Sequence, residues 1–234
     1  MRALEAADVL ALWERGAQRH ALDRSALLCA WARPELAVDQ IADLPLGSVT
    51  ASLLRLREQN FGARIHCHVD CSRCGVRLEL VLRVSDLLTA VAECPPAIDV
   101  QGLRVRAPCL RDLAAVVNQP DPGRAARQLL ARCTLHGDAD AMALDDAALR
   151  AVEDALDALD PNADLALAVH CEACGQHGSA QLDAGTLLWD EIDGRARGLL
   201  GDVHVLARAY GWTEREILAL GASRRAAYLA LAAA

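Results

Sequence analysis

Two copies of the motif Cys-x-x-Cys-Gly, with 96 residues between Cys74 and Cys171, constrain this chain of 234 residues more than any other feature. Two cysteines with this spacing at the tip of a hairpin direct both thiolates at one ion, and the glycine lets the backbone turn behind them. Structural zinc takes four such ligands at tetrahedral corners. The two motifs therefore predict one structural zinc site, with four ligands: Cys71, Cys74, Cys171 and Cys174.

Alternating apolar residues surround the two motifs. The residues that alternate before and after the first motif are Ile65, Cys67 and Val69, then Leu78, Leu80 and Leu82. The second motif has Leu165, Leu167 and Val169 before it, and a more polar run, Ser179, Gln181 and Asp183, after it. A period of two residues is typical of strands. Each motif is therefore predicted to join two strands, and the two hairpins are predicted to form one zinc ribbon split by an inserted segment.

Composition predicts that most of the remaining chain is helical. Leucine and alanine dominate, and aromatic residues make up only 3% of the chain. Good helix formers outnumber β-branched residues, which favours helices over a β-sandwich. We therefore predict a mostly α-helical α+β fold with three parts: a helical N-terminal unit (1–62), a zinc-ribbon domain (63–182) whose largely helical insertion covers about 86–160, and a C-terminal helical arm (183–234).

The last fifty residues carry the clearest helical pattern. One apolar stripe runs from Leu187 to Tyr210, and Gly211 ends it. Thr213 and Glu216 then form the sequence of a capping box, which predicts a further short helix. The stripe and the arginines that follow it are residue types that interfaces favour. The predicted partner-binding residues of this arm are Trp189, His204, Tyr210, Trp212, Arg224, Arg225 and Tyr228.

Charge and the absence of targeting signals limit the class of protein. The net charge is -8, the pI is about 5.3, and all 24 basic residues are arginine. Such acidity argues against nucleic acid as a ligand. Residues 138–193 hold 14 acids and one arginine, whereas residues 195–234 hold six arginines and three acids, a polarity that suits charged protein partners. Without an apolar span or signal peptide, the chain is predicted to be cytoplasmic, where paired cysteines indicate metal before disulfide.

Other interpretations of the same residues remain open. The cysteine pairs also fit a redox dithiol or unmetallated packing thiols, although a thioredoxin-type pair needs a helix start after a strand. His66, His68, His170 and His177 lie close enough in sequence to replace a thiolate, but we interpret them as solvated or hydrogen-bonded neighbours. No phosphate loop, nucleophile elbow or His-Glu-x-x-His motif is present, so we predict no enzymatic activity and no small-molecule substrate. A zinc-ribbon regulator associated with nucleic acid is the second functional interpretation, and a thiol redox protein is the third.

Several blocks resemble a known family, the T-even-type baseplate hub assembly proteins of contractile phage tails and phage-tail-like injection systems. The blocks are Leu12–Gly16, Leu44–Gly47, Leu53–Arg57, Phe61–Gly62, both cysteine motifs, Leu188–Ile192, Val203–Trp212, Glu216–Leu220 and Arg224–Leu229. The sequence departs from the family pattern at Ser72 and Glu172, where proline often follows the first cysteine. The resemblance implies a non-enzymatic protein that helps assemble the baseplate or becomes part of it. It also implies partners among other baseplate or tail proteins and a location in the bacterial cytoplasm or the finished tail.

Overall fold

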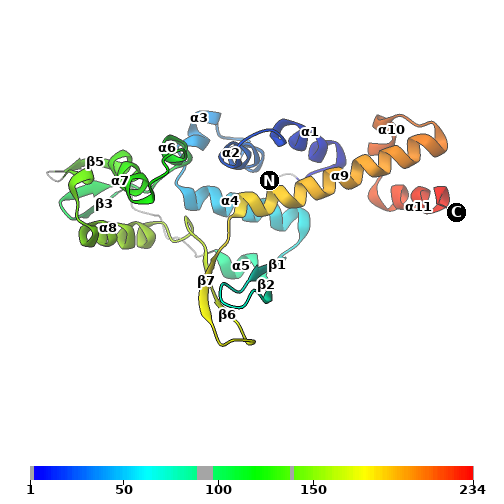
Figure 1. Cartoon of the computed structure of the whole chain (residues 1–234). Helices are drawn as coiled ribbons and strands as arrows, with labels where there is room; N and C mark the ends of the chain where they lie inside the picture. The colour runs from blue at the N-terminus through cyan, green and yellow to red at the C-terminus, as the bar shows by residue number, and fades with distance from the viewer. Residues whose placement is uncertain (1–2, 89–96, 138–139, 234) are drawn as a thin grey trace.

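A computed structural model describes residues 3–88, 97–137 and 140–233 of the chain (Figure 1). It confirms the predicted class. The chain is a mostly helical α+β protein in which two hairpins carry the four cysteines, a helical insertion separates the hairpins, and a long helix follows them. Within the described ranges, no helix is long and apolar enough to cross a membrane.

Four helices begin the chain, and the first, second and fourth of them pack against the first half of a fifth, distant helix. The four are α1 (Ala6–Gly16), α2 (Ala21–Ala32), α3 (Val38–Ala42) and α4 (Leu46–Phe61), and the distant helix is α9 (Ala184–Tyr210). Their apolar faces meet in one continuous core, whose fully buried members include Leu12, Leu28, Leu54, Leu188 and Ile192. The predicted boundary at 182/183 therefore cuts through this core, because the first half of α9 completes the N-terminal unit.

The first hairpin follows α4 directly. Strands β1 (Arg64–Asp70) and β2 (Arg77–Arg83) pair in antiparallel register, with Cys67 opposite Leu80. Helix α5 (Val84–Leu87) follows β2 and packs against α4. The sequence also predicts a short helix from Asp86 to Ala92, which agrees with α5 only at its start, since residues 89–92 lie outside the described residues.

The insertion has a small core of its own. Its helices are α6 (Leu110–Val116), α7 (Pro122–Cys133), the 3-10 helix η1 (Ala141–Ala143) and α8 (Asp146–Leu159). Three antiparallel strands pack with them in the order β3 (Ile98–Val100), β4 (Leu103–Val105), β5 (Thr134–Gly137). Leu103, Val105, Leu130, Leu149 and Val152 form the buried centre of this part. The insertion is thus largely helical, as predicted, but it also contains a small sheet. The sequence predicts one strand of this sheet, from Leu103 to Arg106, and not the other two.

The second hairpin returns the chain to the main body. Strands β6 (Ala166–His170) and β7 (His177–Gln181) are antiparallel, and α9 begins three residues after β7. Beyond the core, α9 continues into an arm to which α10 (Glu214–Leu218) and α11 (Ala222–Ala232) pack back. Figure 1 shows the insertion and this arm at opposite ends of the body, with both hairpins below it. The predicted capping box of Thr213 and Glu216 is confirmed at the start of α10.

Candidate metal centre

The first cysteine motif forms a tight turn that closes the first hairpin. The backbone N–H of Gly75 donates to the carbonyl of Cys71 over 2.9 Å, and the N–H of Cys71 donates to the carbonyl of Val76 over 2.9 Å. Gly75 has a φ of +72°, in the left-handed region where glycine carries no steric penalty. The glycine after the second cysteine is therefore needed for the turn that brings Cys71 and Cys74 to the same side.

The second motif repeats the same turn about a hundred residues later. Gly175 N–H donates to the carbonyl of Cys171 over 2.8 Å, and Cys171 N–H donates to the carbonyl of Gln176 over 2.8 Å. The φ of Gly175 is +70°. The two Cys-x-x-Cys-Gly turns, called knuckles below, thus have the same backbone hydrogen bonds and the same glycine conformation. Each knuckle therefore presents its two sulfurs in the same way.

The two knuckles bring their four sulfurs together. All four Sγ atoms lie within 4.8 Å of one another. Cys71 Sγ lies 3.7 Å from Cys174 Sγ, and Cys74 Sγ lies 3.6 Å from Cys171 Sγ. With zinc–sulfur bonds of about 2.3 Å, the edge of a tetrahedral four-sulfur site is about 3.8 Å. The cluster predicted from the two motifs is therefore confirmed as a group able to hold a metal ion in the manner of a zinc ribbon.

Backbone hydrogen bonds favour the metal-binding form of one ligand. The backbone N–H groups of Cys74 and then of Arg73 donate to the Cys71 sulfur and lower the pKa of its thiol to about 6. Because hydrogen bonds to a charged group stabilise that charged form, the thiolate of Cys71 is favoured near neutral pH. A metal ligand must be deprotonated, so the turn prepares Cys71 to coordinate.

Burial differs in a regular way among the four cysteines. Cys71 and Cys171, the first cysteine of each knuckle, are buried, whereas Cys74 is exposed and Cys174 is half-buried. Next to Cys71 and Cys171, a small hollow is lined by residues of both hairpins, among them Val69, Leu78 and Val169. The inner faces of the hairpins therefore face each other next to the cluster, and the cluster lies at their exposed tips.

The histidines near the knuckles lie apart from the cluster. In the described part of the chain, the one group of three or more metal-ligand side chains is the four cysteines, without a histidine. His170 and His177 lie opposite each other on β6 and β7, and their rings stack with centroids 4.3 Å apart. The interpretation of the nearby histidines as neighbours rather than ligands agrees with this arrangement.

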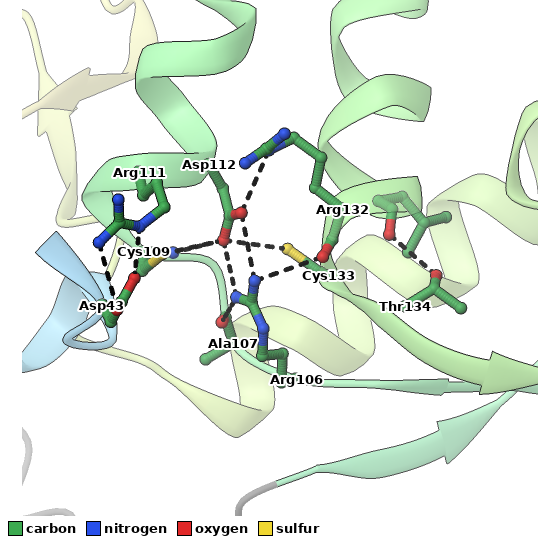
Figure 2. A network of polar contacts seen from close by, with 10 residues as sticks. Asp43, Arg106, Ala107, Cys109, Arg111, Asp112, Arg132, Cys133 and Thr134 are labelled. Carbon is green, nitrogen blue, oxygen red and sulfur yellow. Dashed lines mark hydrogen bonds and ion pairs between the residues drawn. The ribbon is translucent and has the colours of Figure 1, made fainter.

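A buried carboxylate, which the sequence did not single out, binds two of the remaining cysteines. Asp112 is 1% exposed and accepts hydrogen bonds from Arg106 over 2.7 Å, from Arg132 over 3.2 Å and from the thiol of Cys109 over 3.0 Å (Figure 2). The Cys133 thiol also points at this carboxylate, at 3.9 Å. Burial, followed by the charge of Asp112, raises the pKa of Cys133 to about 12, so this thiol is unreactive.

The Asp112 network lies within the insertion, next to the place where the insertion contacts the N-terminal unit. It lies at the start of α6, beside the contact in which Leu46 N–H donates to the carbonyl of Pro108 over 3.0 Å. Next to it, Arg111 forms an ion pair with Asp43 over 2.7 Å.

Of the other cysteines, Cys29 is buried and Cys67 is half-buried, whereas Cys94 lies outside the described residues.

The predicted partner-binding residues lie in two different environments. Trp189 is 5% exposed and packs in the core, with the Arg24 guanidinium 4.5 Å from its ring centre, so no partner reaches it in this structure. On the arm, Tyr210 stacks on Trp212 at 4.7 Å, and Tyr228 meets Trp212 edge-on at 4.8 Å. Arg225 is paired with Asp202 over 2.9 Å. His204 and Arg224 are exposed.

Comparison with protein-family models, curated proteins and solved structures found no match to this chain. The four-cysteine site is therefore assigned from its own geometry.

Proposed function

We propose that the four cysteines hold one structural zinc ion in a non-enzymatic protein that helps assemble, or forms part of, the baseplate of a contractile phage tail or phage-tail-like injection system. The zinc assignment depends on the convergence of four sulfurs at separations that suit a tetrahedral thiolate site. Zinc favours such soft ligands, and four protein thiolates leave no open coordination position for a substrate or water. The metal therefore has a structural role and not a catalytic one.

The need for a metal follows from the size of the two hairpins. Each is a separate two-stranded sheet, and an isolated two-stranded hairpin is marginally stable in water. Binding of structural zinc supplies about 10 to 16 kcal/mol in small zinc domains, which is enough to hold such hairpins together. One ion bound between Cys71/Cys74 and Cys171/Cys174 also closes the loop formed by the insertion, so it fixes where both ends of the insertion leave the body.

The baseplate assignment draws on the resemblance of the sequence blocks, and the packing of those blocks supports a structural role for them. Trp13 donates through its indole N–H to Asp193 over 2.7 Å. Gly16 lies directly under the Trp189 ring, where an added Cβ would come within 2.3 Å of it. Residues of the first block thus join α1 to α9 through Trp189, in the Leu188–Ile192 block, and through Asp193, directly after it. None of these residues forms a catalytic arrangement of nucleophile and base.

The arm offers the surface on which a tail protein would dock. Its aromatic cluster and the ion pair of Arg225 with Asp202 hold α11 against α9, so the arm is preorganised, which lowers the entropy lost on binding. Arg224 is the neighbour of Arg225 but points to solvent. We therefore separate the predicted partner residues into those that shape the arm, such as Trp212, Tyr228 and Arg225, and those available for contact, such as His204 and Arg224.

Metal analysis tests the zinc assignment. Inductively coupled plasma mass spectrometry of freshly purified protein is expected to find one zinc per chain. The Cys71→Ser and Cys174→Ser variants are expected to contain no zinc. Cys67→Ser is the matched control, because Cys67 lies on the same hairpin but outside the cluster, and it should retain the metal. His170→Gln with His177→Gln removes the stacked histidine pair as a source of adventitious metal. Protein that lacks zinc, or Cys71→Ser protein that keeps it, would contradict the assignment.

Copurification tests the baseplate assignment. In a host that produces contractile tails, tagged protein is expected to recover identified baseplate or tail proteins, and Arg224→Glu is expected to reduce that recovery at unchanged helix content. Val81→Ser is the control, since Val81 is a 61% exposed apolar residue on the distant first hairpin. Recovery of nucleic acid that falls steeply with salt would instead favour the regulator interpretation. Absence of tail proteins from the purified material would contradict the proposal.

A further inference from the structure

We infer that the four-cysteine site has a second, metal-free and disulfide-bonded form. In this form, oxidation has linked Cys71 to Cys174 and Cys74 to Cys171 by two disulfides between the hairpins. The inference rests on the proposed function for its setting, because a protein carried in a tail particle leaves the reducing cytoplasm. It concerns the regulation of the same site. The geometry of the sulfurs determines which of the three pairings of four cysteines would form.

Among the four mutually close sulfurs, two hydrogen-bond contacts run between the knuckles. The contacts of 3.7 Å, from Cys71 to Cys174, and 3.6 Å, from Cys74 to Cys171, each join one hairpin to the other. A disulfide bond is about 2.05 Å long, so each pair must approach by about 1.6 Å, which small side-chain rotations supply. Both cross pairs use all four sulfurs once, so the two disulfides are compatible with each other.

Exposure gives each cross pair one sulfur that an oxidant reaches and one that it does not. Cys74 is exposed and contacts buried Cys171, while Cys174 is half-buried and contacts buried Cys71. An oxidised outer sulfur would therefore have a protected inner sulfur of the opposite hairpin as its nearest partner. This arrangement favours fast closure to a disulfide over further oxidation of the outer sulfur.

Hydrogen peroxide oxidises one cysteine pair, Cys71 and Cys174, to a disulfide in two steps. The thiol of Cys174 gives up its proton and its sulfur attacks one peroxide oxygen, so that a sulfur–oxygen bond forms and the oxygen–oxygen bond breaks. The hydroxide that leaves takes that proton as water, and sulfur has lost the two electrons that peroxide gains. The Cys71 thiolate then attacks the sulfenic sulfur, a disulfide forms, the sulfur–oxygen bond breaks, and the departing hydroxide becomes water with the proton that Cys71 had released. Two thiols and one peroxide thus give one disulfide and two waters.

The sequence permits a direct map of the pairing. Trypsin cleaves after Arg73 and Glu-C protease cleaves after Glu172, so one cut falls between the two cysteines of each knuckle. Double digestion under non-reducing conditions therefore places the four sulfurs on separate fragments. A Cys67→Ser background is used because Cys67 would otherwise share the tryptic fragment of Cys71.

The experiment starts from full-length protein whose zinc content has been measured, removes the metal with a chelator and adds stoichiometric peroxide before alkylation. Mass spectrometry is expected to find Cys71 fragments linked to Cys174 and Cys74 fragments linked to Cys171, at least tenfold above links within a knuckle. The oxidised, metal-free protein should also unfold at a higher temperature than the reduced, metal-free protein. Cys74→Ser with Cys171→Ser should retain the single Cys71–Cys174 link.

Three results would overturn the inference: links mainly within a knuckle, conversion of the cysteines to sulfinic acid without disulfides, or no gain in thermal stability on oxidation. These outcomes are distinct from failure of the proposed function. Absence of zinc at the start would contradict the zinc assignment but leave the disulfide map readable. Links within the knuckles, in protein that had carried one zinc, would contradict this inference alone.

Discussion

Arg57 on α4 forms a bidentate ion pair with Glu191 on α9, with Nη2 2.7 Å from Oε1 and Nε 3.0 Å from Oε2. Arg57 is 4% exposed, and its remaining nitrogen donates to the carbonyls of Gly62 and Arg64. One guanidinium therefore joins the end of α4, the turn after it, the first strand of the ribbon and the long C-terminal helix. The first hairpin is attached to the helical core at this point.

Arg57→Met is expected to destabilise the protein by about 3 kcal/mol, because it leaves two backbone carbonyls and a partly buried carboxylate without their donor. Urea unfolding followed by circular dichroism measures this difference. Arg77→Met is the matched control, since Arg77 and Asp70 are both well exposed and their closest atoms are 3.7 Å apart. Such a surface pair contributes about 0 to 1 kcal/mol. Equal losses for the two variants would show that Arg57 does not have the structural role described here.

Removal of zinc is expected to loosen the hairpins while the helical core remains folded. The core of α1, α2, α4 and α9 has its own continuous set of buried apolar side chains, to which Ile65 and Leu165 attach only the base of each hairpin. The rest of each hairpin depends on the joint between Cys71/Cys74 and Cys171/Cys174. Hydrogen exchange measured by mass spectrometry, with and without a chelator, should therefore show faster exchange in residues 64–83 and 166–181. Exchange in α1 and the first half of α9 should change little. Uniform acceleration across the chain would contradict a local role for the metal.

The parts of the fold that were predicted correctly are those with a local or chemically strict signal. The cysteine spacing fixes the ligand set, since four thiolates at one ion leave few alternatives. Thr213 and Glu216 lie three residues apart, so their capping box is readable without any tertiary information. The turn between β3 and β4 was not predicted. In the structure, Gln101 and Gly102 have φ values of 51° and 74°, the conformation of a type I′ turn. Three-residue strands beside that turn are too short for a period-two pattern to be distinguished.

The parts that were not predicted depend on contacts between distant segments. Trp189 lies on the apolar stripe of α9 whether that stripe faces a partner or the chain itself, and the sequence does not distinguish the two. Its burial follows from Gly16, 173 positions earlier, which leaves room for the indole ring. In the same way, the role of Asp112 requires Arg106 and Arg132 to meet around it. Single residues of these kinds carry no spacing that would identify them.

Two glycine substitutions are expected to have opposite effects. At Gly47, an added Cβ would lie 1.9 Å from Oδ1 of Asp160, whose other oxygen accepts from the Gly47 N–H over 2.8 Å. Gly47→Ala is therefore expected to destabilise by about 1 to 3 kcal/mol. Gly198→Ala is expected to stabilise by about 0.5 to 1 kcal/mol, because it lies within α9 and an added Cβ there meets no atom within 4 Å. Thermal unfolding of the two variants measures both signs, and a stabilised Gly47→Ala protein would contradict the packing described.

The buried Asp112 gives a prediction for pH. Burial alone would raise the pKa of this carboxyl, but hydrogen bonds from Arg106 and Cys109 outweigh that effect and hold the pKa at about 2. A carboxyl in an unfolded chain has a pKa of about 3.9. Since the folded pKa is the lower one, the carboxylate stabilises the folded state fully above about pH 4, and this contribution is lost as pH falls toward 2.

Asp112→Asn is therefore expected to destabilise the protein by about 1 to 2 kcal/mol at pH 7, because charge-assisted hydrogen bonds are replaced by weaker ones. The difference from the unmodified protein should stay constant down to about pH 4 and shrink as the pH approaches 2. Urea unfolding of both proteins at pH 7, 4 and 2.5 measures it, and release of zinc in acid cancels because both carry the same four cysteines. A difference that remains undiminished at pH 2.5 would mean that the charge of Asp112 is not what holds Arg106 and Arg132 together, and the contact of α6 with α7 and β4 in the insertion would then have to depend on packing alone.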